Sequence, residues 1–432
     1  MNDPVSRVRI VADAIQTEPV SLEGEDYYQD PWGFFARLRE SRPVTKVRMP
    51  GYGHAWVVTR YADVRAALAD PRLARDTNRW PGGARARPSE ARGVAAHMLH
   101  ADPPDHARLR RPAQKALTPR RIAQLQPRTA QIAASLADEM AAASEVTDLL
   151  TAYARPLPVT VLCELLGVPE ADRSPVSATV LRYDAAGEMP RVEDDLAAYF
   201  TGLIAARRAE PGDDLLSALI AASDEAGQTE RQLTVTELVS TAFLLVMAGF
   251  DTTVNLIASG TLALLAHPQE LARLRENRSL LPAAVEELLR FTSPVNHAND
   301  RFTTEEVSIA GTTVPAGEWV IMALPSANRD CARFPRPDRL DLGRDTSGHV
   351  AFGHGIHYCL GAPLARMEAT VALSTLLDRF PRLSLAVPPE TLRWRPVSLM
   401  NGLESLPVRL SLSFRCWSGR VAEPFEVHDE FQ

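Results

Sequence analysis

Cysteine is scarce in this chain of 432 residues, and its four cysteines lie far apart, at positions 163, 331, 359 and 416. No two of them form a CxxC pair, so the sequence predicts neither a disulfide framework nor a tetrahedral zinc site. Cys163, in the apolar run VTVLCELLGV, is predicted to be a small buried residue. A metal bound by Cys359 would therefore need its other ligands from a cofactor.

A strong charge of one sign is also lacking. The formal net charge is −7, and no long run of like charges occurs, which argues against nucleic-acid binding as the main function. The N-terminal segment lacks the apolar core of a signal peptide. The best membrane-span candidate, Ala242–Phe250, is interrupted by Asp251, Thr252 and Thr253. We expect a soluble, cytoplasmic protein that binds neither nucleic acid nor membrane.

Internal repeats and linkers are missing as well, which favours a single domain over residues 26–414. An irregular lead-in (1–25) and a loosely held tail (415–432) would flank it. Apolar periodicity predicts mainly helices, with a hairpin at 44–59 and short strands within 295–325 and 383–414. The fold class is thus mainly α with small β-sheets (α+β). The predicted helices span 31–40, 61–69, 104–117, 119–143, 146–167, 194–208, 214–226, 234–266, 280–291 and 360–379.

The helix from Thr234 to about Ala266 is the longest. Thr234 and Glu237 have the spacing of a capping box, and His267-Pro268 ends the pattern. At about 1.5 Å per residue, this helix is about 48 Å long and crosses the whole domain. Because it is apolar on nearly all sides from Leu238 to Phe250, we expect it to be central.

A cysteine-containing loop, GHVAFGHGIHYCLGAPLARMEAT (348–370), precedes another helical pattern. Gly353 and Gly355 permit a tight turn, and Cys359 stands just before the predicted helix. The free N–H groups and the dipole at a helix start favour a thiolate. A stabilised thiolate with no partner cysteine nearby suits a soft metal ligand.

The sequence AGFDTT (248–253) interrupts the long helix with a carboxylate and hydroxyl groups. An acid and an alcohol at Asp251 and Thr252, beside the small Gly249, suit proton delivery to a bound species. The structural alternative carries equal weight: Asp251 pairs with a buried arginine, and the threonines bond back to the helix.

Charged residues elsewhere indicate further contacts. Glu287 and Arg290 share a helix face and predict a structural ion pair, which Arg339 could extend. Two histidines and two arginines would together suit the carboxylates of a large planar cofactor, although each alone is more typical of an ordinary surface or paired residue. These four residues are His106, Arg110, Arg301 and His357.

These motifs resemble the cytochrome P450 family. FGHGIHYCLG is similar to its haem-binding loop, AGFDTT to its oxygen-activation motif, and EELLR to its glutamate–arginine pair. HARLR and DRF resemble its propionate-binding positions, and all five occur in the family's order over residues 30–412. The resemblance implies the P450 fold with a long central helix over haem. The resemblance is strongest to soluble actinomycete enzymes that modify natural products.

The resemblance also implies roles for the residues. Cys359 would be the axial thiolate of haem b (iron protoporphyrin IX). Phe352, Gly353 and Gly361 would contact the haem, and Asp251 and Thr252 would organise protons for bound dioxygen. The propionates would be anchored by His106, Arg110, Arg301 and His357.

The implied activity is a monooxygenase that hydroxylates or epoxidises a medium-sized apolar natural product, such as a macrolide or other polyketide, in antibiotic or secondary-metabolite biosynthesis. The alternatives are a non-oxygenating haem-thiolate catalyst, a haem-binding protein, or oxidation of a terpenoid, peptide or carrier-tethered substrate. No flavin or nicotinamide motif occurs, so a ferredoxin and its reductase would supply electrons, with Arg111 and Arg344 in the docking surface.

The arginine-rich segment 72–92 fits the family motifs least. We interpret it as a solvated loop, with recognition of an anionic substrate group through Arg85 and Arg87 as the less favoured hypothesis.

Overall fold

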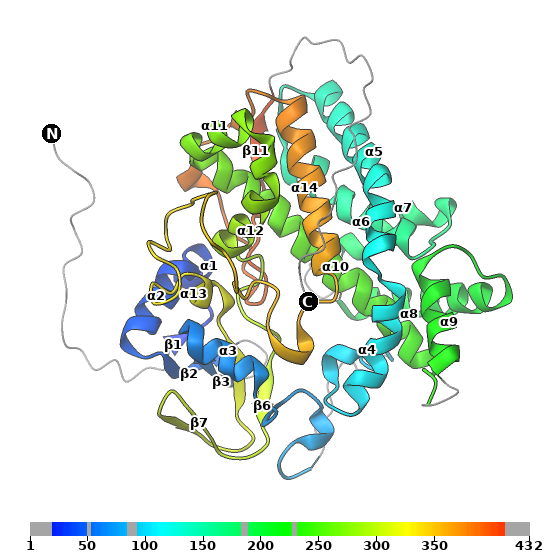
Figure 1. Ribbon diagram of the computed structural model, residues 1–432, viewed down its shortest axis with the longest axis vertical. Helices are drawn as coiled ribbons and strands as arrows, with labels where there is room; N and C mark the ends of the chain where they lie inside the picture. Colours follow the sequence, from blue (N-terminus) through cyan, green and yellow to red (C-terminus); the bar gives the residue numbers. More distant parts are fainter. Residues whose placement is uncertain (1–19, 50–52, 84–92, 183–188, 227–230, 411–432) are drawn as a thin grey trace.

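The computed structural model describes residues 20–49, 53–83, 93–182, 189–226 and 231–410. Helices form most of it, as predicted (Figure 1). They are α1 (Glu25–Gln29), α2 (Pro31–Ser41), α3 (Tyr61–Ala69), α4 (Asp105–Ala116), α5 (Pro119–Ala143), α6 (Pro156–Leu165), α7 (Glu170–Leu181), α8 (Met189–Ala209), α9 (Leu215–Ala226), α10 (Val235–Ala266), α11 (Pro268–Glu276), α12 (Leu281–Thr292), α13 (Leu324–Asn328) and α14 (Ala362–Arg379).

The central helix, α10, begins with the predicted capping box. The Glu237 N–H donates to Thr234 Oγ1 over 3.1 Å, and the Thr234 N–H donates to Glu237 Oε2 over 2.8 Å. Helices α6, α8, α12 and α14 pack around it. A Cβ on Gly249 would lie 3.1 Å from Leu162, so the glycine lets α6 approach closely. Although α10 is long and apolar enough to cross a membrane, 67% of its most apolar window is buried inside the protein.

Short strands form the rest of the fold. They are β1 (Val20–Ser21), β2 (Val44–Met49), β3 (Gly53–Val58), β4 (Leu73–Ala74), β5 (Val146–Asp148), β6 (Arg301–Thr303), β7 (Val307–Ile309), β8 (Thr312–Val314), β9 (Trp319–Met322), β10 (Ser384–Leu385) and β11 (Pro407–Arg409). The main sheet has the order β1-β2-β3-β9-β6-β4, and β10-β11-β5 and β7-β8 form two smaller sheets. In the main sheet, β4 pairs antiparallel with β6, with Leu73 opposite Thr303 and Ala74 opposite Phe302.

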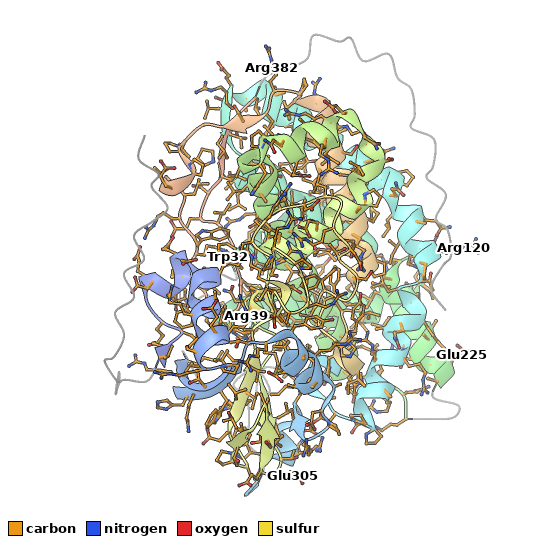
Figure 2. The ribbon with its side chains drawn as sticks, turned by 60° about the vertical axis from the view of Figure 1, so that its left-hand side comes forward. Trp32, Arg39, Arg120, Glu225, Glu305 and Arg382 are labelled. Carbon is orange, nitrogen blue, oxygen red and sulfur yellow. The ribbon has the colours of Figure 1, made fainter. Side chains whose placement is uncertain are left out.

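The β-rich part and the end of α14 occupy opposite ends of the molecule. Figure 2 shows Glu305, between β6 and β7, at one end and Arg382, just after α14, at the other. The helices α4 to α9 form the other side of the molecule from the main sheet (Figure 1). The cysteine loop that precedes α14 therefore lies between a helical part and a sheet part.

Two predicted boundaries are wrong. The irregular lead-in was expected to reach residue 25, but Val20–Ser21 pairs with β2 as a parallel strand. The single helix predicted over 146–167 is instead a strand, β5, then a five-residue π-helical turn at Leu150–Ala154, and then α6. The cause is long-range pairing, since β5 joins β11 from the far end of the chain. The tail after residue 410 lies outside the described residues.

Candidate active site

The loop before α14 positions Cys359. Gly353 and Gly355 have φ angles of 74° and 77°, and a Cβ on Gly355 would lie 2.9 Å from the Leu68 carbonyl oxygen. The turn is closed by the Cys359 N–H, which donates to the Phe352 carbonyl over 3.0 Å. Helix α14 begins three residues later, at Ala362. Backbone N–H groups of Gly361 and Ala362 are directed at the Cys359 sulfur.

The pKa of the Cys359 thiol is raised overall, although some neighbouring groups act in the opposite direction. Burial raises the pKa of the thiol, while the Gly361 and Ala362 N–H groups and the charges of Arg110 and Arg366 lower it. Even so, Cys359 is accessible at the surface of the loop. Burial disfavours the thiolate form of this sulfur, although its surface can still be reached. A bound metal ion would keep the sulfur ionised, because metal coordination deprotonates a thiol outright. This chemistry fits a metal ligand.

Behind the cysteine, Phe352 is held by a charged cluster. The Arg366 guanidinium lies 4.5 Å from the centre of the Phe352 ring. Arg366 Nε and Nη2 donate to the Glu286 carboxylate over 2.6 and 2.9 Å, and His349 Nε2 lies 2.9 Å from the same group. Although burial acts in the opposite direction, bonds from His349 and Arg366 lower the pKa of Glu286 to about 2. Glu286 thus fixes both basic groups beside Phe352.

Two arginines and two neutral histidines gather beside the cysteine loop, and we call these four residues (His106, Arg110, Arg301 and His357) the cationic cluster after its arginines. The rings of His106, on α4, and His357 are 4.5 Å apart, and Arg110 Nη2 donates to the Tyr358 carbonyl over 2.7 Å. Burial and neighbouring arginines lower the pKa of His106 to about 4 and that of His357 to about 2. Arg301 opens β6, where burial lowers its pKa to about 10. Three of the four predicted residues are thus directly linked to the cysteine loop or to each other, and Arg301 adds its charge to both histidines.

This cationic cluster contains buried nitrogen atoms that have no hydrogen-bond partner in the described chain. His106 Nε2, His357 Nε2 and Arg301 Nε have no hydrogen-bond partner among the described residues. Buried polar atoms are almost always bonded, so such orphans require an explanation. A ligand that carries carboxylates would satisfy them and neutralise the arginines. With the accessible sulfur of Cys359 beside them, they fit an iron porphyrin with two propionates.

On α10, the structure contains both contacts expected from the structural alternative, namely an arginine paired with Asp251 and a threonine bonded back to its own helix. Arg395 Nη2 donates to the two Asp251 oxygens over 2.8 and 2.9 Å, and Thr252 Oγ1 donates to the Ala248 carbonyl over 2.7 Å. Asp251 is buried, but Ala248 is exposed and Thr252 half-exposed in the middle of a buried helix. These two residues, one turn apart, form an accessible strip on the central helix, where another molecule can approach the backbone closely.

The ion pair on α12 was predicted correctly, but its extension was not. Arg290 donates to both oxygens of Glu287 over 2.7 and 2.8 Å, and both side chains are buried. The third member is Arg344, whose Nε lies 3.1 Å from Glu287, whereas Arg339 contributes its carbonyl oxygen. With a side chain only 8% exposed, Arg344 cannot take part in the docking surface predicted for it. Arg111 is exposed.

Sequence reasoning missed three residues of this region, namely Arg75, Glu286 and Arg395. Arg75 was placed in a solvated loop but is 2% exposed. The apolar Leu73-Ala74 before it, which is strand β4, was a usable signal. Arg395 and Glu286 meet their partners through contacts between distant segments, for which no local pattern exists. Arg85 and Arg87 lie outside the described residues.

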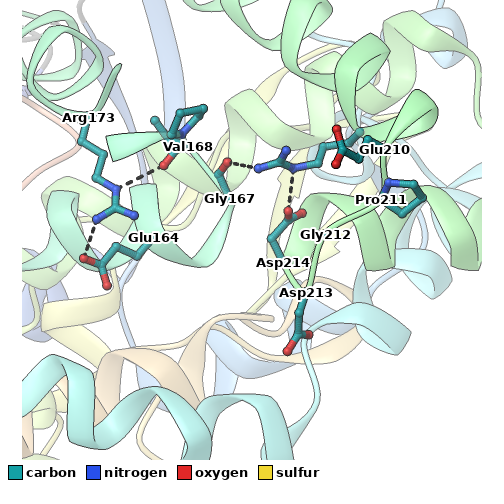
Figure 3. A pocket seen from close by; sticks show the side chains of 11 residues that line it. Glu164, Gly167, Val168, Arg173, Glu210, Pro211, Gly212, Asp213 and Asp214 are labelled. Carbon is teal, nitrogen blue, oxygen red and sulfur yellow. Dashed lines mark hydrogen bonds and ion pairs between the residues drawn. The ribbon is translucent and has the colours of Figure 1, made fainter. Parts of the chain in front are cut away.

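A separate pocket of about 480 Å³ is lined by the α6–α7 and α8–α9 connections (Figure 3). Its charged groups bond each other: Arg173 pairs with Glu164, and Arg207 pairs with Asp214 and donates to the Gly167 carbonyl. None of the predicted site residues lines it. It differs from the cationic cluster because its arginines already have acidic partners.

Fold and site together define a haem-thiolate protein, and the comparisons with known proteins agree. Residues 172–403 match the family model described as Cytochrome P450. Cytochrome P450 107B1 of Saccharopolyspora erythraea is 47% identical over 393 residues, which cover 89% of this chain and 96% of that protein. The mycinamicin IV hydroxylase/epoxidase of Micromonospora griseorubida is 42% identical over 382 residues, covering 87% and 94%.

Solved structures give the same result. The tirandamycin C-bound P450 monooxygenase TamI superposes with a TM-score of 0.82 at 46% identity, covering 91% of this chain and all of that one. The chain therefore belongs to the cytochrome P450 family, and its fold is the P450 fold. Its cofactor is haem b, and it is an oxygenating oxidoreductase that takes electrons from redox partners and binds small-molecule substrates.

Proposed function

We propose that this enzyme inserts one atom of O2 into a macrolide or other polyketide, by hydroxylation or epoxidation, during antibiotic or secondary-metabolite biosynthesis. The observation that carries the haem site is the set of buried nitrogen atoms without hydrogen-bond partners, on His106, His357 and Arg301, beside the accessible sulfur of Cys359. The substrate class rests on relatives whose names specify mycinamicin and tirandamycin. A terpenoid, peptide or carrier-tethered substrate is the alternative.

Haem, once bound, supplies the oxidising chemistry and the protein supplies orientation, protons and dryness. Cys359 would bind the haem iron through its sulfur, and the Gly361 and Ala362 N–H groups would moderate the charge of that sulfur. Phe352 and Gly353 would pack at the haem edge. The histidine and arginine donors of the cationic cluster, His106, Arg110, Arg301 and His357, would hold the propionates.

Proton supply would come from α10. Thr252 is half-exposed on the accessible strip, and its hydroxyl can exchange the Ala248 carbonyl for a bound molecule. Asp251 would return a proton to the Thr252 hydroxyl. It is the neighbouring residue in the sequence, and Arg395 holds its carboxylate in place. Insertion of one oxygen atom consumes two electrons and two protons and releases water, so a defined proton donor raises the yield of product.

Thr252→Ala tests this assignment. In turnover with a ferredoxin, its reductase and O2, the variant should consume electrons at a similar rate but release more hydrogen peroxide and less product. Thr253→Ala is the matched control, because Thr253 is buried on the same helix turn. Equal product per electron in Thr252→Ala and the wild type would contradict the role of Thr252.

Cys359→Ala tests the metal ligand. The variant should lose the absorbance band of the reduced carbon monoxide complex that is typical of thiolate-bound haem. The distant Cys331→Ala, which is also exposed, should keep it. An unchanged spectrum in Cys359→Ala would mean that another group binds the iron.

A non-oxygenating haem-thiolate catalyst, or a haem-binding protein, is the second candidate. The observation in its favour is that Arg395 occupies both Asp251 oxygens while Thr252 bonds back to its own helix. Formation of product that contains oxygen from labelled O2 distinguishes the two. A screen of polyketides, read as a shift of the Soret band on binding, selects the substrate for that experiment.

We further infer a cytoplasmic location, a single catalytic domain over residues 26–414 to which the strand Val20–Ser21 also belongs, and electron supply by a ferredoxin. The ferredoxin would dock on the cysteine side of the protein. Arg111, which is exposed, stays a candidate contact, and Arg366 joins it with a side chain 34% exposed. If docking is electrostatic, the rate of reduction by ferredoxin should fall as ionic strength rises.

A further inference from the structure

The loop between α12 and β6 holds two adjacent polar side chains that are almost completely buried. Asn296 is 4% exposed and His297 is 3% exposed. Each has one buried atom, Asn296 Oδ1 and His297 Nε2, without a hydrogen-bond partner among the described residues. Buried polar atoms are almost always bonded, so two neighbouring exceptions indicate a partner from outside the chain.

Both atoms are hydrogen-bond acceptors. Asn296 Nδ2 donates to the Ser398 and Met400 carbonyls over 3.3 and 3.4 Å, which orients the amide and leaves Oδ1 to accept. His297 Nδ1 lies 3.0 Å from the Ala298 carbonyl oxygen. A carbonyl oxygen only accepts, so Nδ1 carries a proton. Burial lowers the pKa of His297, so the ring is neutral and has no second proton. Nε2 therefore presents a lone pair.

Two adjacent acceptors restrict the chemistry of their partner. An ionised carboxylate has no hydrogen to donate, so a haem propionate does not satisfy them. A protonated amine donates hydrogens, but neither Asn296 nor neutral His297 offsets its charge, and a buried charge without an opposite charge is costly. A hydroxyl group donates a hydrogen without bringing a charge. The loop is thus suited to a ligand that carries hydroxyl groups.

The loop connects two parts of the candidate active site. On one side, the Asn296 N–H donates to the Leu399 carbonyl over 2.8 Å. The segment that follows Leu399 accepts the backbone N–H of Arg395, also over 2.8 Å, and the Arg395 side chain holds Asp251 on α10. On the other side, β6 begins soon after the loop with Arg301 of the cationic cluster. The two acceptors therefore lie between the helix that would deliver protons and the cationic cluster.

We propose that Asn296 and His297 form a hydroxyl-binding subsite for the substrate. The inference rests on the proposed function and deepens it, because it specifies a hydroxylated polyketide in place of a wholly apolar one. The bound hydroxyl would not be the group that is oxidised. It would fix the orientation of the substrate and thereby select the carbon atom presented for reaction.

The test uses two isomeric probes, octanol and heptyl methyl ether, of which only the alcohol can donate a hydrogen bond. Their dissociation constants are measured with the haem-loaded enzyme from the Soret shift. The wild type should bind octanol about tenfold more tightly than the ether. His297→Phe should prefer the ether, because a hydroxyl buried without a partner costs free energy. His54→Phe, the same change at an exposed position on β3, should keep the wild-type preference.

A second readout observes the acceptor itself. In enzyme with isotope-labelled histidine, reduced and bound to carbon monoxide, the nitrogen NMR signal of His297 Nε2 should be that of an unprotonated nitrogen. The signal is assigned by its loss in His297→Gln. It should move when octanol is added and stay in place with the ether. Gln supplies an acceptor oxygen, so His297→Gln should retain part of the preference for octanol, and it decides the test if His297→Phe does not bind haem.

The outcomes are distinct. A protonated Nε2 in the wild type would overturn the inference, and so would an equal ratio of the two dissociation constants in the wild type, His297→Phe and His297→Gln. A signal that octanol does not move would mean that the two acceptors bind only water, which also overturns it. If the wild type lacks the thiolate carbon monoxide band, the proposed function fails, whatever the two probes show.

Discussion

Two buried clusters of basic side chains in this protein are built in opposite ways. On α12, Arg290 donates to both oxygens of Glu287 and to the carbonyls of Asn328 and Pro337, so its charge and its donors are matched within the chain. In the cationic cluster beside the cysteine loop, His106, His357 and Arg301 each keep a buried nitrogen atom without a hydrogen-bond partner in the described chain. Within the described chain, the hydrogen-bonding groups of Arg290 are satisfied, whereas those of the cationic cluster are not.

The difference separates architecture from binding. A satisfied buried network fixes the positions of α12, α13 and the loop that follows, and it needs no other molecule. Buried polar groups without partners destabilise the folded chain until a ligand forms hydrogen bonds with them. Such groups are therefore expected where ligand binding offsets the lost free energy. Burial and charge alone do not distinguish the two clusters, since Arg290 and Arg301 are both almost inaccessible.

The largest expected effect comes from breaking the complete cluster. Arg290→Met leaves the buried Glu287 carboxylate without its main partner and should lower the free energy of unfolding by about 3–5 kcal/mol. The loss should be equal in the haem-loaded and haem-free proteins, because no ligand contacts this pair. Urea unfolding followed by circular dichroism measures both. Arg278→Met, which breaks an exposed pair with Asp378, is the control and should change little.

A smaller and unequal effect is expected from Arg301→Met. In the haem-loaded protein the variant loses a charge-assisted hydrogen bond and should be destabilised by about 1.5–3 kcal/mol. In the haem-free protein the same change removes a donor that is already unpaired, so the loss should be much smaller. Urea unfolding of both forms gives the comparison. Equal losses in the two forms would show that Arg301 belongs to the architecture after all.

The smallest effect concerns Glu286, which is satisfied by Arg366 and His349 but is partly exposed. Its pKa is lowered to about 2 in the folded protein, so its stabilising contribution is fully present above the unfolded pKa of about 4.5. That contribution is lost as pH falls through 2. The free energy of unfolding of Glu286→Gln should therefore lie about 1–2 kcal/mol below the wild type near pH 6, after allowance for solvent screening.

Urea unfolding of the wild type and Glu286→Gln at several pH values tests this. The gap between the two should narrow as the solution is acidified from pH 5 towards pH 2. A gap that is constant over this range would mean that the carboxylate is not held ionised by its partners. Lys115→Met, which breaks an exposed pair with Glu225, serves as a reference for a surface ion pair.

Local signals in the sequence were enough for most of the fold. Helices α3 and α5 have the predicted bounds, and the capping box at Thr234 starts α10 as expected. These elements depend on periodicity and caps within one segment. Strand β5 was missed because its partner β11 lies more than 250 residues away, and the two β-branched residues Val146 and Thr147 are too short a strand signal to stand out from the helical spacing around them.

The site residues also divide into those that local sequence signals identify and those that depend on contacts between distant segments. Cys359, His357 and Phe352 lie in one loop and so could be assigned together from the sequence. Arg75, Arg395 and Glu286 join the region through pairs between remote segments, such as Asp251 with Arg395, 144 residues apart. The position of Arg75 depends on the register between β4 and β6, and that register is set by the whole sheet. Local patterns carry no information on it.

The contact between Arg110 and the Tyr358 carbonyl has a consequence for how the enzyme is made. Its two partners are 248 residues apart, and the cysteine follows Tyr358 directly. During translation, the helix that carries His106 and Arg110 leaves the ribosome long before the loop that carries Cys359. A nascent chain therefore has half of a cofactor site for most of its synthesis. Haem binding that uses both halves of the site therefore requires the C-terminal part of the chain and comes late in synthesis.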